Sequence, residues 1–172
     1  MNYKSFADLS NDIREWIKEL PQDFDLIVGI PRSGLLAANL IALYRNLPIT
    51  DIDGLINNRI MATGERLDLR CKLNLNNKKL KILIVDDSVA TGTQMRKVKQ
   101  KINSQNLKCE ICYGAVYATK KGAKHVNYTY KTLSTPRCFE WNIFHHGGIL
   151  EKSCVDIDGI LCQDPTEKEN DD

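Results

Sequence analysis

The chain has 172 residues, of which 42% are hydrophobic and 27% are charged, and this length and composition fit one globular domain with a hydrophobic core. The chain has 24 Lys and Arg residues and 22 Asp and Glu residues, and it has no long basic run. Its overall charge therefore does not support a nucleic-acid-binding or membrane-binding protein. The sequence has no run of the roughly 18 apolar residues that a membrane span needs and no apolar N-terminal signal, which predicts a cytoplasmic protein.

Hydrophobic periodicity predicts helices that alternate with strands along most of the chain. Apolar residues from Phe6 to Leu20 recur at helical spacing and stop before Pro21. Asp25–Ile30 then has the pattern of a short apolar strand, and this alternation is typical of a parallel sheet with helices on both faces. The later predicted elements are a helix at 35–46, a strand at 48–52, a polar loop at 56–79, a strand from 80, a helix at 93–103 and strands at 109–119 and 125–133.

The strand that starts at Leu80 ends in two adjacent carboxylates. The stretch LKILIVDDSVATGT has five apolar residues in its first six positions, which suits a strand covered on both faces. Asp86 and Asp87 do not fit inside such a core, so we place them where the strand emerges, at the carboxyl edge of the sheet. Open α/β folds bind their ligands at this edge.

The residues after the two aspartates have the chemistry of a phosphate-binding loop. Ser88, Thr91, Gly92 and Thr93 are small, and they let backbone N–H groups and hydroxyls surround an anion at a helix N-terminus. The carboxylates would repel a bare phosphate but would accept hydrogen bonds from the hydroxyls of an attached sugar. These residues therefore indicate a ribose 5-phosphate site. The alternative is a loop that only caps the following helix through Thr91 or Thr93.

The stretch VDDSVATGT resembles the PRPP-binding motif of type I phosphoribosyltransferases, where PRPP is 5-phosphoribosyl 1-pyrophosphate. Upstream, VGIPRSGLLAA resembles the pyrophosphate loop of the same family. The resemblance implies an α/β fold with a mainly parallel twisted sheet flanked by helices, a small hood at 133–150, and Mg²⁺ that enters with PRPP rather than binding directly. It implies PRPP binding by Arg32, Ser33, Gly34, Asp86, Asp87, Ser88, Val89, Ala90, Thr91, Gly92 and Thr93, with Asp86 and Asp87 as the catalytic pair.

The resemblance extends to the acceptor side. AVYATKKG lies where purine-salvage members place a lysine against the base, which makes Lys120 or Lys121 a candidate. RCFEWN resembles the hood segment of xanthine-guanine enzymes, in which a tryptophan stacks on the purine, and Trp141 is the corresponding residue; a buried structural tryptophan is the alternative. Two positions depart from those enzymes: Glu140 replaces a proline, and Ala90 replaces an acidic residue beside the base.

The polar loop at 56–79 is a candidate lid. A reactive ribose has to be kept from water during transfer, so a loop that closes over the site is expected. Arg59, Arg66 and Arg70 could reach the pyrophosphate, although each could equally be an ordinary exposed arginine. The resemblance also implies a homodimer, with residues 55–61 near the partner.

The C-terminal stretch CVDIDGILCQDPT resembles motif I of haloacid dehalogenase-type phosphatases, with Asp156 and Asp158 as the paired aspartates. The sequence ends 14 residues after Asp158, which is too short for the rest of such a domain. We therefore expect residues 1–150 to form a phosphoribosyltransferase domain and 151–172 to be the start of a second, fused domain or a disordered tail.

Three functions fit these features. The first is PRPP-dependent transfer of a phosphoribosyl group to a nitrogenous, nucleobase-like acceptor with release of pyrophosphate. In that reaction His145 or His146 could take the proton that Ala90 cannot. The second is a regulatory protein that senses PRPP without efficient chemistry. The third, an interaction domain with vestigial loops, is disfavoured because both anion loops look intact.

Overall fold

A computed structural model describes residues 1–61, 80–105, 107–145 and 151. Met1–Trp141 forms one compact unit, which contains every strand and every α-helix of the described residues. Its elements are β1 (Asn2–Lys4), α1 (Phe6–Glu19), β2 (Leu26–Gly29), α2 (Ser33–Arg45), β3 (Ile49–Asp51), α3 (Ile52–Ile56), β4 (Lys81–Val89), α4 (Thr93–Asn103), β5 (Glu110–Ala118), α5 (Lys120–Ala123), β6 (Tyr128–Thr132) and β7 (Arg137–Phe139). A 3₁₀ turn, Glu140–His145, follows β7.

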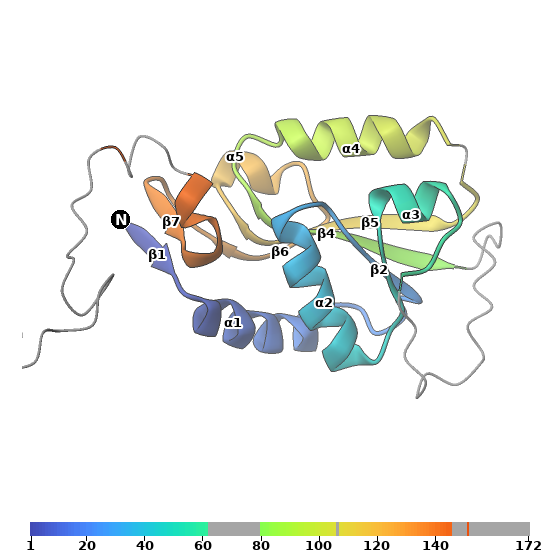
Figure 1. The fold of residues 1–172 in the computed structure, drawn as a ribbon, viewed down its shortest axis with the longest axis horizontal. Helices are drawn as coiled ribbons and strands as arrows, with labels where there is room; N and C mark the ends of the chain where they lie inside the picture. Colours follow the sequence, from blue (N-terminus) through green and yellow to red (C-terminus); the bar gives the residue numbers. More distant parts are fainter. Residues whose placement is uncertain (62–79, 106, 146–150, 152–172) are drawn as a thin grey trace, which may run out of the picture. The chain divides into compact units, whose positions relative to one another are not determined.

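The main sheet has five strands in the order β3-β2-β4-β5-β6, and all four pairings are parallel (Figure 1). This confirms the predicted fold class. The order places β4 at the centre, next to β2, so the loops after these two strands leave the same edge of the sheet side by side. These loops carry the two motifs that the sequence predicts to bind anions.

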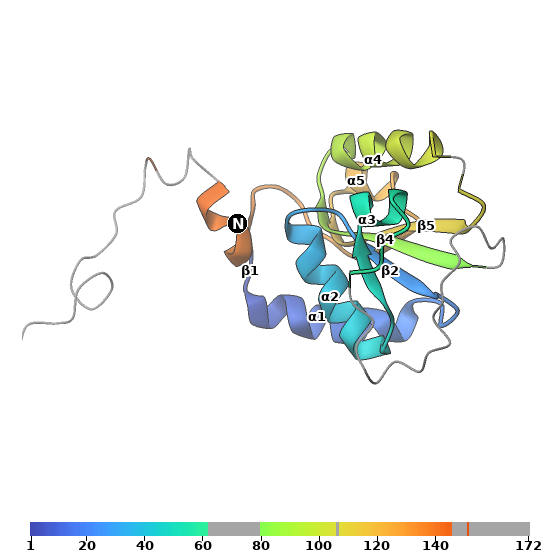
Figure 2. The ribbon, with the colours of Figure 1, turned by 45° about the vertical axis from the view of Figure 1, so that its right-hand side comes forward.

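Helices cover both faces of the sheet (Figure 2). α1 and α2 pack on one face, where Ile13 and Ile41 contact a core that includes Leu83 and Val85 of β4. α3 and α4 pack on the other face against a core that contains the intervening strand residues Ile82 and Ile84. A strand buried on both faces explains the unbroken apolar run of β4. Among the described residues, no helix is long and apolar enough to cross a membrane.

The boundaries of α1 follow from its sequence. Ser5 caps the helix by accepting a hydrogen bond from the Asp8 N–H (3.1 Å), and the Asp8 carboxylate accepts one from the Ser5 N–H (2.9 Å). The helix ends at Glu19, two residues before Pro21. The prediction of this helix from its apolar stripe is confirmed.

The hood differs from the expected segment 133–150, because the N-terminus contributes to it. β1 pairs with β7 in a separate parallel two-stranded sheet, with Tyr3 opposite Cys138. Figure 1 shows this small sheet at one end of the main one. The short segments β1, β7, α3 and α5 were not predicted, because three to five residues are too few to show a period.

A buried ionic cluster ties the N-terminal segment to the main sheet. The carboxylate of Asp12 in α1 accepts hydrogen bonds from Lys4 (3.0 Å), Lys131 (2.6 Å) and the Tyr117 hydroxyl (2.8 Å). Burial would raise the pKa of Asp12, but these three donors together hold it below its usual value. The cluster therefore joins β1, α1, β5 and β6 just below the hood.

Candidate functional site

The two aspartates at the end of β4 have different environments. Asp86 lines a cavity of about 360 Å³ at the edge of the sheet. Asp87 is 4% exposed and accepts a hydrogen bond on Oδ2 from the indole N–H of Trp141 (2.7 Å). The Asp87 backbone N–H donates to Asp86 Oδ1 (3.0 Å), so each side chain has a fixed partner. Adjacent strand residues point to opposite faces, yet the two carboxylates remain close enough for Asp87 to act on the charge of Asp86.

Burial disfavours charge on both aspartates. Burial and the neighbouring Asp87 charge raise the pKa of Asp86 well above its usual value. Burial also raises the pKa of Asp87, although the hydrogen bond from Trp141 opposes this rise. The unliganded protein therefore holds two carboxylates that would be stabilised by hydrogen-bond donors or a nearby cation.

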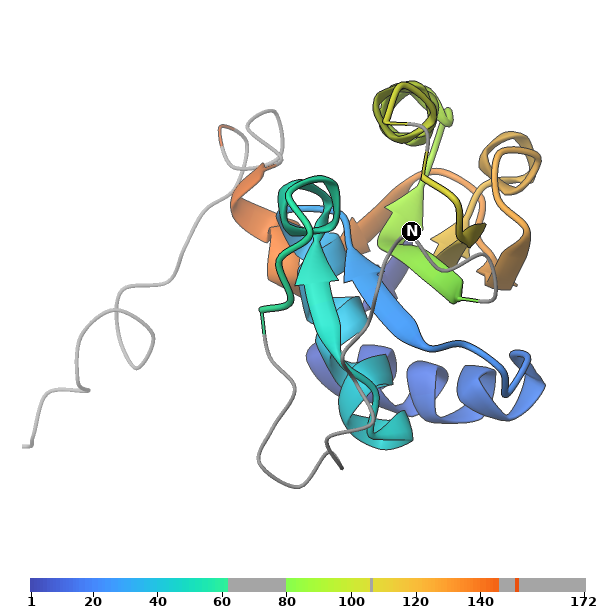
Figure 3. The same cartoon turned by 90° about the vertical axis from the view of Figure 1, so that its right-hand side faces the viewer.

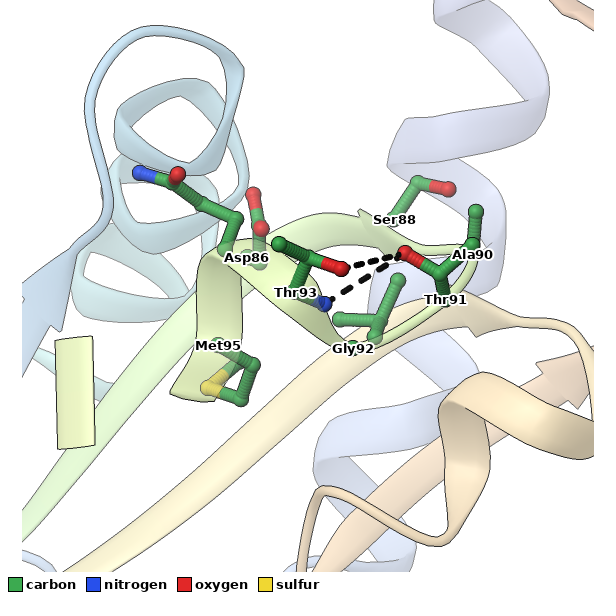
Figure 4. A pocket seen from close by; sticks show the side chains of 9 residues that line it. Asp86, Ser88, Ala90, Thr91, Gly92, Thr93 and Met95 are labelled. Carbon is green, nitrogen blue, oxygen red and sulfur yellow. Dashed lines mark hydrogen bonds between the residues drawn. The ribbon is translucent and has the colours of Figure 1, made fainter. Parts of the chain in front are cut away.

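The loop from Ser88 to Thr93 forms most of the cavity wall (Figure 4). The hydroxyls of Thr91 and Thr93 are 3.0 Å apart, and the Thr93 N–H donates weakly to Thr91 Oγ1 (3.4 Å). Gly92 occupies the left-handed region (φ 77°), which favours glycine. The full lining is Asp86, Ser88, Val89, Ala90, Thr91, Gly92, Thr93, Gln94 and Met95.

Two features of this loop suit an anion. The N-cap of α4 is Gly92, which makes no side-chain capping bond, so the loop is not simply a threonine cap. Ser88 Oγ is buried and has no hydrogen-bond partner among the residues that the structure describes. A buried hydroxyl without a partner is costly, and an oxygen-rich ligand in the cavity would satisfy it.

The second predicted loop lies directly against Asp86. A Cβ atom on Gly34 would be 2.7 Å from the Val85 carbonyl oxygen and 3.0 Å from Asp86 Oδ1, so only glycine allows this approach. Arg32 is exposed and immediately precedes α2, and the Pro31–Arg32 peptide bond is cis. The structure thus brings the segment Arg32–Gly34 and the Ser88–Thr93 loop together around Asp86.

Trp141 is part of an aromatic stack beside Asp87. Its ring lies 5.0 Å from the Phe139 ring and 6.2 Å from the Tyr117 ring, at interplanar angles of 22° and 21°. Phe6 of α1 contacts it at 6.0 Å and a tilt of 58°. The indole is partly buried and is held by both its ring and its N–H. It thus connects the hood to the end of β4.

Sequence reasoning missed Arg137, which lies in β7 close to this stack. Its guanidinium is 5.5 Å from the Phe139 ring centroid, and its Nη1 is buried with no hydrogen-bond partner among the described residues. Burial lowers the pKa of Arg137, and the charge of Asp87 opposes this effect. The only signal in the sequence was its place two residues before Phe139 in a strand, which puts both side chains on one face.

Lys120 and Lys121 are exposed and open the short helix α5. Hydrogen bonds attach the start of this helix to the Ser88–Thr93 loop. The Thr119 hydroxyl donates to the Ala90 carbonyl oxygen (2.5 Å), and the Thr119 N–H donates to the Val89 carbonyl oxygen (3.0 Å). The two lysines therefore follow a segment anchored to the cavity wall, and the structure does not single out either of them.

The lid is described only in part, and the C-terminal motif lies outside the described residues. Arg59 is exposed, and its guanidinium lies 3.6 Å from the Asp51 carboxylate. The remaining predicted residues, Arg66, Arg70, His146, Asp156 and Asp158, lie outside the described residues.

Residues 2–148 match the family model of the phosphoribosyl transferase domain. The amidophosphoribosyltransferase of Pyrococcus horikoshii is 33% identical over 93 residues, which cover 49% of this chain and 20% of that protein. The orotate phosphoribosyltransferase of Sulfurisphaera tokodaii is 31% identical over 103 residues, which cover 60% of this chain and 48% of that protein. The chain thus spans only about a fifth to a half of the length of these relatives.

The fold is similar to that of solved structures. The purine phosphoribosyltransferase from Pyrococcus horikoshii Ot3 superimposes with a TM-score of 0.60 at 18% identity, over 81% of this chain and 92% of that one. At this level of identity the match supports the fold, and the site has to be argued from this chain's own residues.

We predict that Asp86→Asn stabilises the unliganded protein. Because the pKa of Asp86 is raised in the folded state, its ionised form costs stability above that pKa, and the cost disappears as the pH falls below the unfolded value. At pH 7.5 the variant should therefore have a higher Tm than the wild-type protein. The gain should vanish near pH 3.5, which thermal melts across this range would test.

Asp23→Asn is the matched control. Asp23 precedes β2 at the opposite edge of the sheet, and its hydrogen bond from Lys81 lowers its pKa, so this variant should gain nothing at pH 7.5. Equal changes in Tm for the two variants would contradict the assignment of a costly charge to Asp86.

Proposed function

Because the chain belongs to the phosphoribosyl transferase domain family, we propose that it transfers the phosphoribosyl group of PRPP to a nitrogen nucleophile. The nitrogen lone pair forms the new bond to ribose C1, and the bond from C1 to the pyrophosphate oxygen breaks, so pyrophosphate leaves with the electron pair. One observation carries the proposal: two anion-binding loops from distant parts of the chain meet at Asp86.

Each part of PRPP has a counterpart in this arrangement. The Ser88–Thr93 loop would hold the 5-phosphate with N–H groups and hydroxyls at the start of α4. Asp86 would accept hydrogen bonds from the ribose hydroxyls, in addition to the one that its Oδ1 accepts from the Asp87 N–H. The segment Arg32–Gly34 at the start of α2 would hold the pyrophosphate, whose leaving charge an arginine and helix N–H groups stabilise.

Mg²⁺ fits this site as a companion of the substrate. Among the described residues, no group of three or more His, Cys, Asp or Glu side chains could hold a metal. Mg²⁺ typically binds through one or two carboxylates together with substrate phosphates and water. Asp86 could supply such a carboxylate, and the ion would neutralise charge on the departing pyrophosphate.

The hood would bind the acceptor. We propose that Trp141 stacks on a flat, nucleobase-like acceptor and that Lys120 or Lys121 donates to an oxygen on its ring. Asp87 would hold the ribose hydroxyls together with Asp86, and its Oδ2 also accepts a hydrogen bond from the Trp141 indole (2.7 Å). The ribose end of the site and the acceptor end are therefore connected by this one hydrogen bond.

A PRPP-sensing regulatory protein is the second candidate function. Ala90 favours it, since the carbonyl of this residue bonds Thr119 and its methyl group offers no acid–base chemistry beside an acceptor. Both candidates require PRPP binding, but only an enzyme releases pyrophosphate when an acceptor is added. Incubating the protein with Mg-PRPP and a panel of purines, pyrimidines and small amines separates the two.

We also propose a homodimer in which residues 55–61 approach the partner. Sedimentation that shows only monomer at high protein concentration would reject it. The predictions of a fused phosphatase-like domain that starts at residue 151 and of a cytoplasmic location still rest on the sequence alone.

We predict that Asp86→Asn, which should be more stable, binds Mg-PRPP at least about tenfold more weakly, because charge-assisted hydrogen bonds to the ribose are lost. Asp23→Asn should bind like the wild type. Isothermal titration with Mg-PRPP measures both affinities, and release of pyrophosphate in the same samples measures turnover. Wild-type affinity in Asp86→Asn would remove the proposed ribose contact, and no heat with the wild-type protein would refute PRPP binding itself.

For the acceptor, we predict that Trp141→Ala raises the KM of an active acceptor at least about tenfold, because a stacked ring pair is lost. Trp141→Phe keeps an aromatic face but loses the hydrogen bond to Asp87, so it should retain most acceptor affinity. An unchanged acceptor KM in Trp141→Ala, together with aggregation, would instead support a purely structural indole.

A further inference from the structure

The phosphate cavity has an unusual charge balance. Within the described part of the chain, the nine residues that line it include no Lys, Arg or His, and the only charged one is Asp86. A bound 5-phosphate would carry up to two negative charges, and backbone N–H groups alone compensate such charge only in part. A positively charged side chain in contact with the loop would add to this compensation.

Arg96, in the first turn of α4, lies directly behind this wall. Its Nη2 donates to Thr93 Oγ1 (3.2 Å), and its Nη1 lies 3.4 Å from the Thr91 carbonyl oxygen. The planar fork of the guanidinium therefore contacts both threonines of the loop from outside the cavity. Figure 4 shows these two threonine side chains together at the cavity wall.

The contact with Thr93 also restricts the hydroxyl hydrogens. A guanidinium can only donate, so Thr93 Oγ1 accepts from Arg96. Thr91 and Thr93 share one hydroxyl hydrogen across their 3.0 Å contact. The other hydroxyl hydrogen remains available to donate to an oxygen anion in the cavity.

A third residue holds Arg96 in place. The His125 ring follows α5, and its Nε2 lies 3.3 Å from Arg96 Nη1. The ring also fills the space beside Gly92, where an added Cβ would be 2.0 Å from His125 Cδ2. Figure 3 shows α4 and α5 side by side on the same face of the sheet. His125 thus packs against the anion loop and against the side chain that supports it.

We propose that Arg96 is a positioning residue for the 5-phosphate. It supplies positive charge next to a cavity wall whose described lining has none, and it orients the Thr91–Thr93 hydroxyl pair so that one hydroxyl hydrogen can donate into the cavity. It acts through Thr93 rather than on the reacting atoms. This inference rests on the proposed function, because it takes the anion in the cavity to be the 5-phosphate of PRPP. It extends the site to a residue outside the recognised motif.

The test compares Arg96→Gln with Lys97→Gln. The two variants each remove one positive charge from consecutive exposed positions of α4, but among the described residues Lys97 makes no hydrogen bond to either threonine and lines a different cavity. Calorimetry would measure the Kd of ribose 5-phosphate and of Mg-pyrophosphate separately. We expect Arg96→Gln to weaken the binding of ribose 5-phosphate about tenfold or more and to leave the binding of Mg-pyrophosphate unchanged. Lys97→Gln should change the Kd of either ligand by less than about twofold.

Two further measurements separate positioning from folding. Arg96→Lys keeps the charge without the fork, so it should recover part of the affinity for ribose 5-phosphate. In an active protein, Arg96→Gln should raise the KM for PRPP more than it lowers kcat, and its thermal melt should match that of Lys97→Gln.

Equal losses of ribose 5-phosphate affinity in Arg96→Gln and Lys97→Gln would overturn the proposal. Equal losses of affinity for ribose 5-phosphate and for pyrophosphate in Arg96→Gln would also overturn it, because either result would indicate a general electrostatic effect of the lost charge. A wild-type protein that binds neither Mg-PRPP nor ribose 5-phosphate would refute the proposed function instead. Normal wild-type binding with an unaffected Arg96→Gln variant would refute only the role of Arg96.

Discussion

A buried carboxylate needs a hydrogen-bond donor, and Asp87 has one in the indole N–H of Trp141. This bond joins the central strand to the hood, which the chain reaches only 54 residues later. Because Asp86 is the next residue along the strand, the same bond fixes where the cavity begins. The arrangement of the site therefore depends on satisfying a group that the fold has removed from water.

The hood is held from behind as well. Tyr117 stacks on Phe139 (5.4 Å, 20°), and its hydroxyl donates to Asp12, which also binds Lys4 and Lys131. The aromatic stack thus rests on an ionic cluster that includes the N-terminal strand. Buried pairs of this kind contribute little net stability over apolar packing, but removing one partner is costly, so they specify geometry.

The phosphate end of the site follows the same principle with opposite charge. The anion loop presents small side chains and N–H groups, and its cationic support, Arg96, contacts it from outside the cavity. The Asp86 carboxylate lies where the two loops meet, and Arg96 contacts the Ser88–Thr93 loop. In the proposed function this arrangement suits a ligand with hydroxyls at its centre and phosphate groups at its ends.

The sequence by itself determined the parallel α/β fold and the place of Asp86 and Asp87 near the carboxyl end of the central strand, and it marked the segments Arg32–Gly34 and Ser88–Thr93 as candidate anion loops. These features are local, because a period of apolar residues or a short motif records them within a few positions. Only the tertiary structure decided that Asp87 binds Trp141 and that β1 pairs with β7, which lies 135 positions later in the sequence. The contact between Arg96 and His125, which are 29 positions apart, was likewise decided by the tertiary structure. Contacts over such separations depend on the path of the whole chain, and no local pattern of side chains encodes that path.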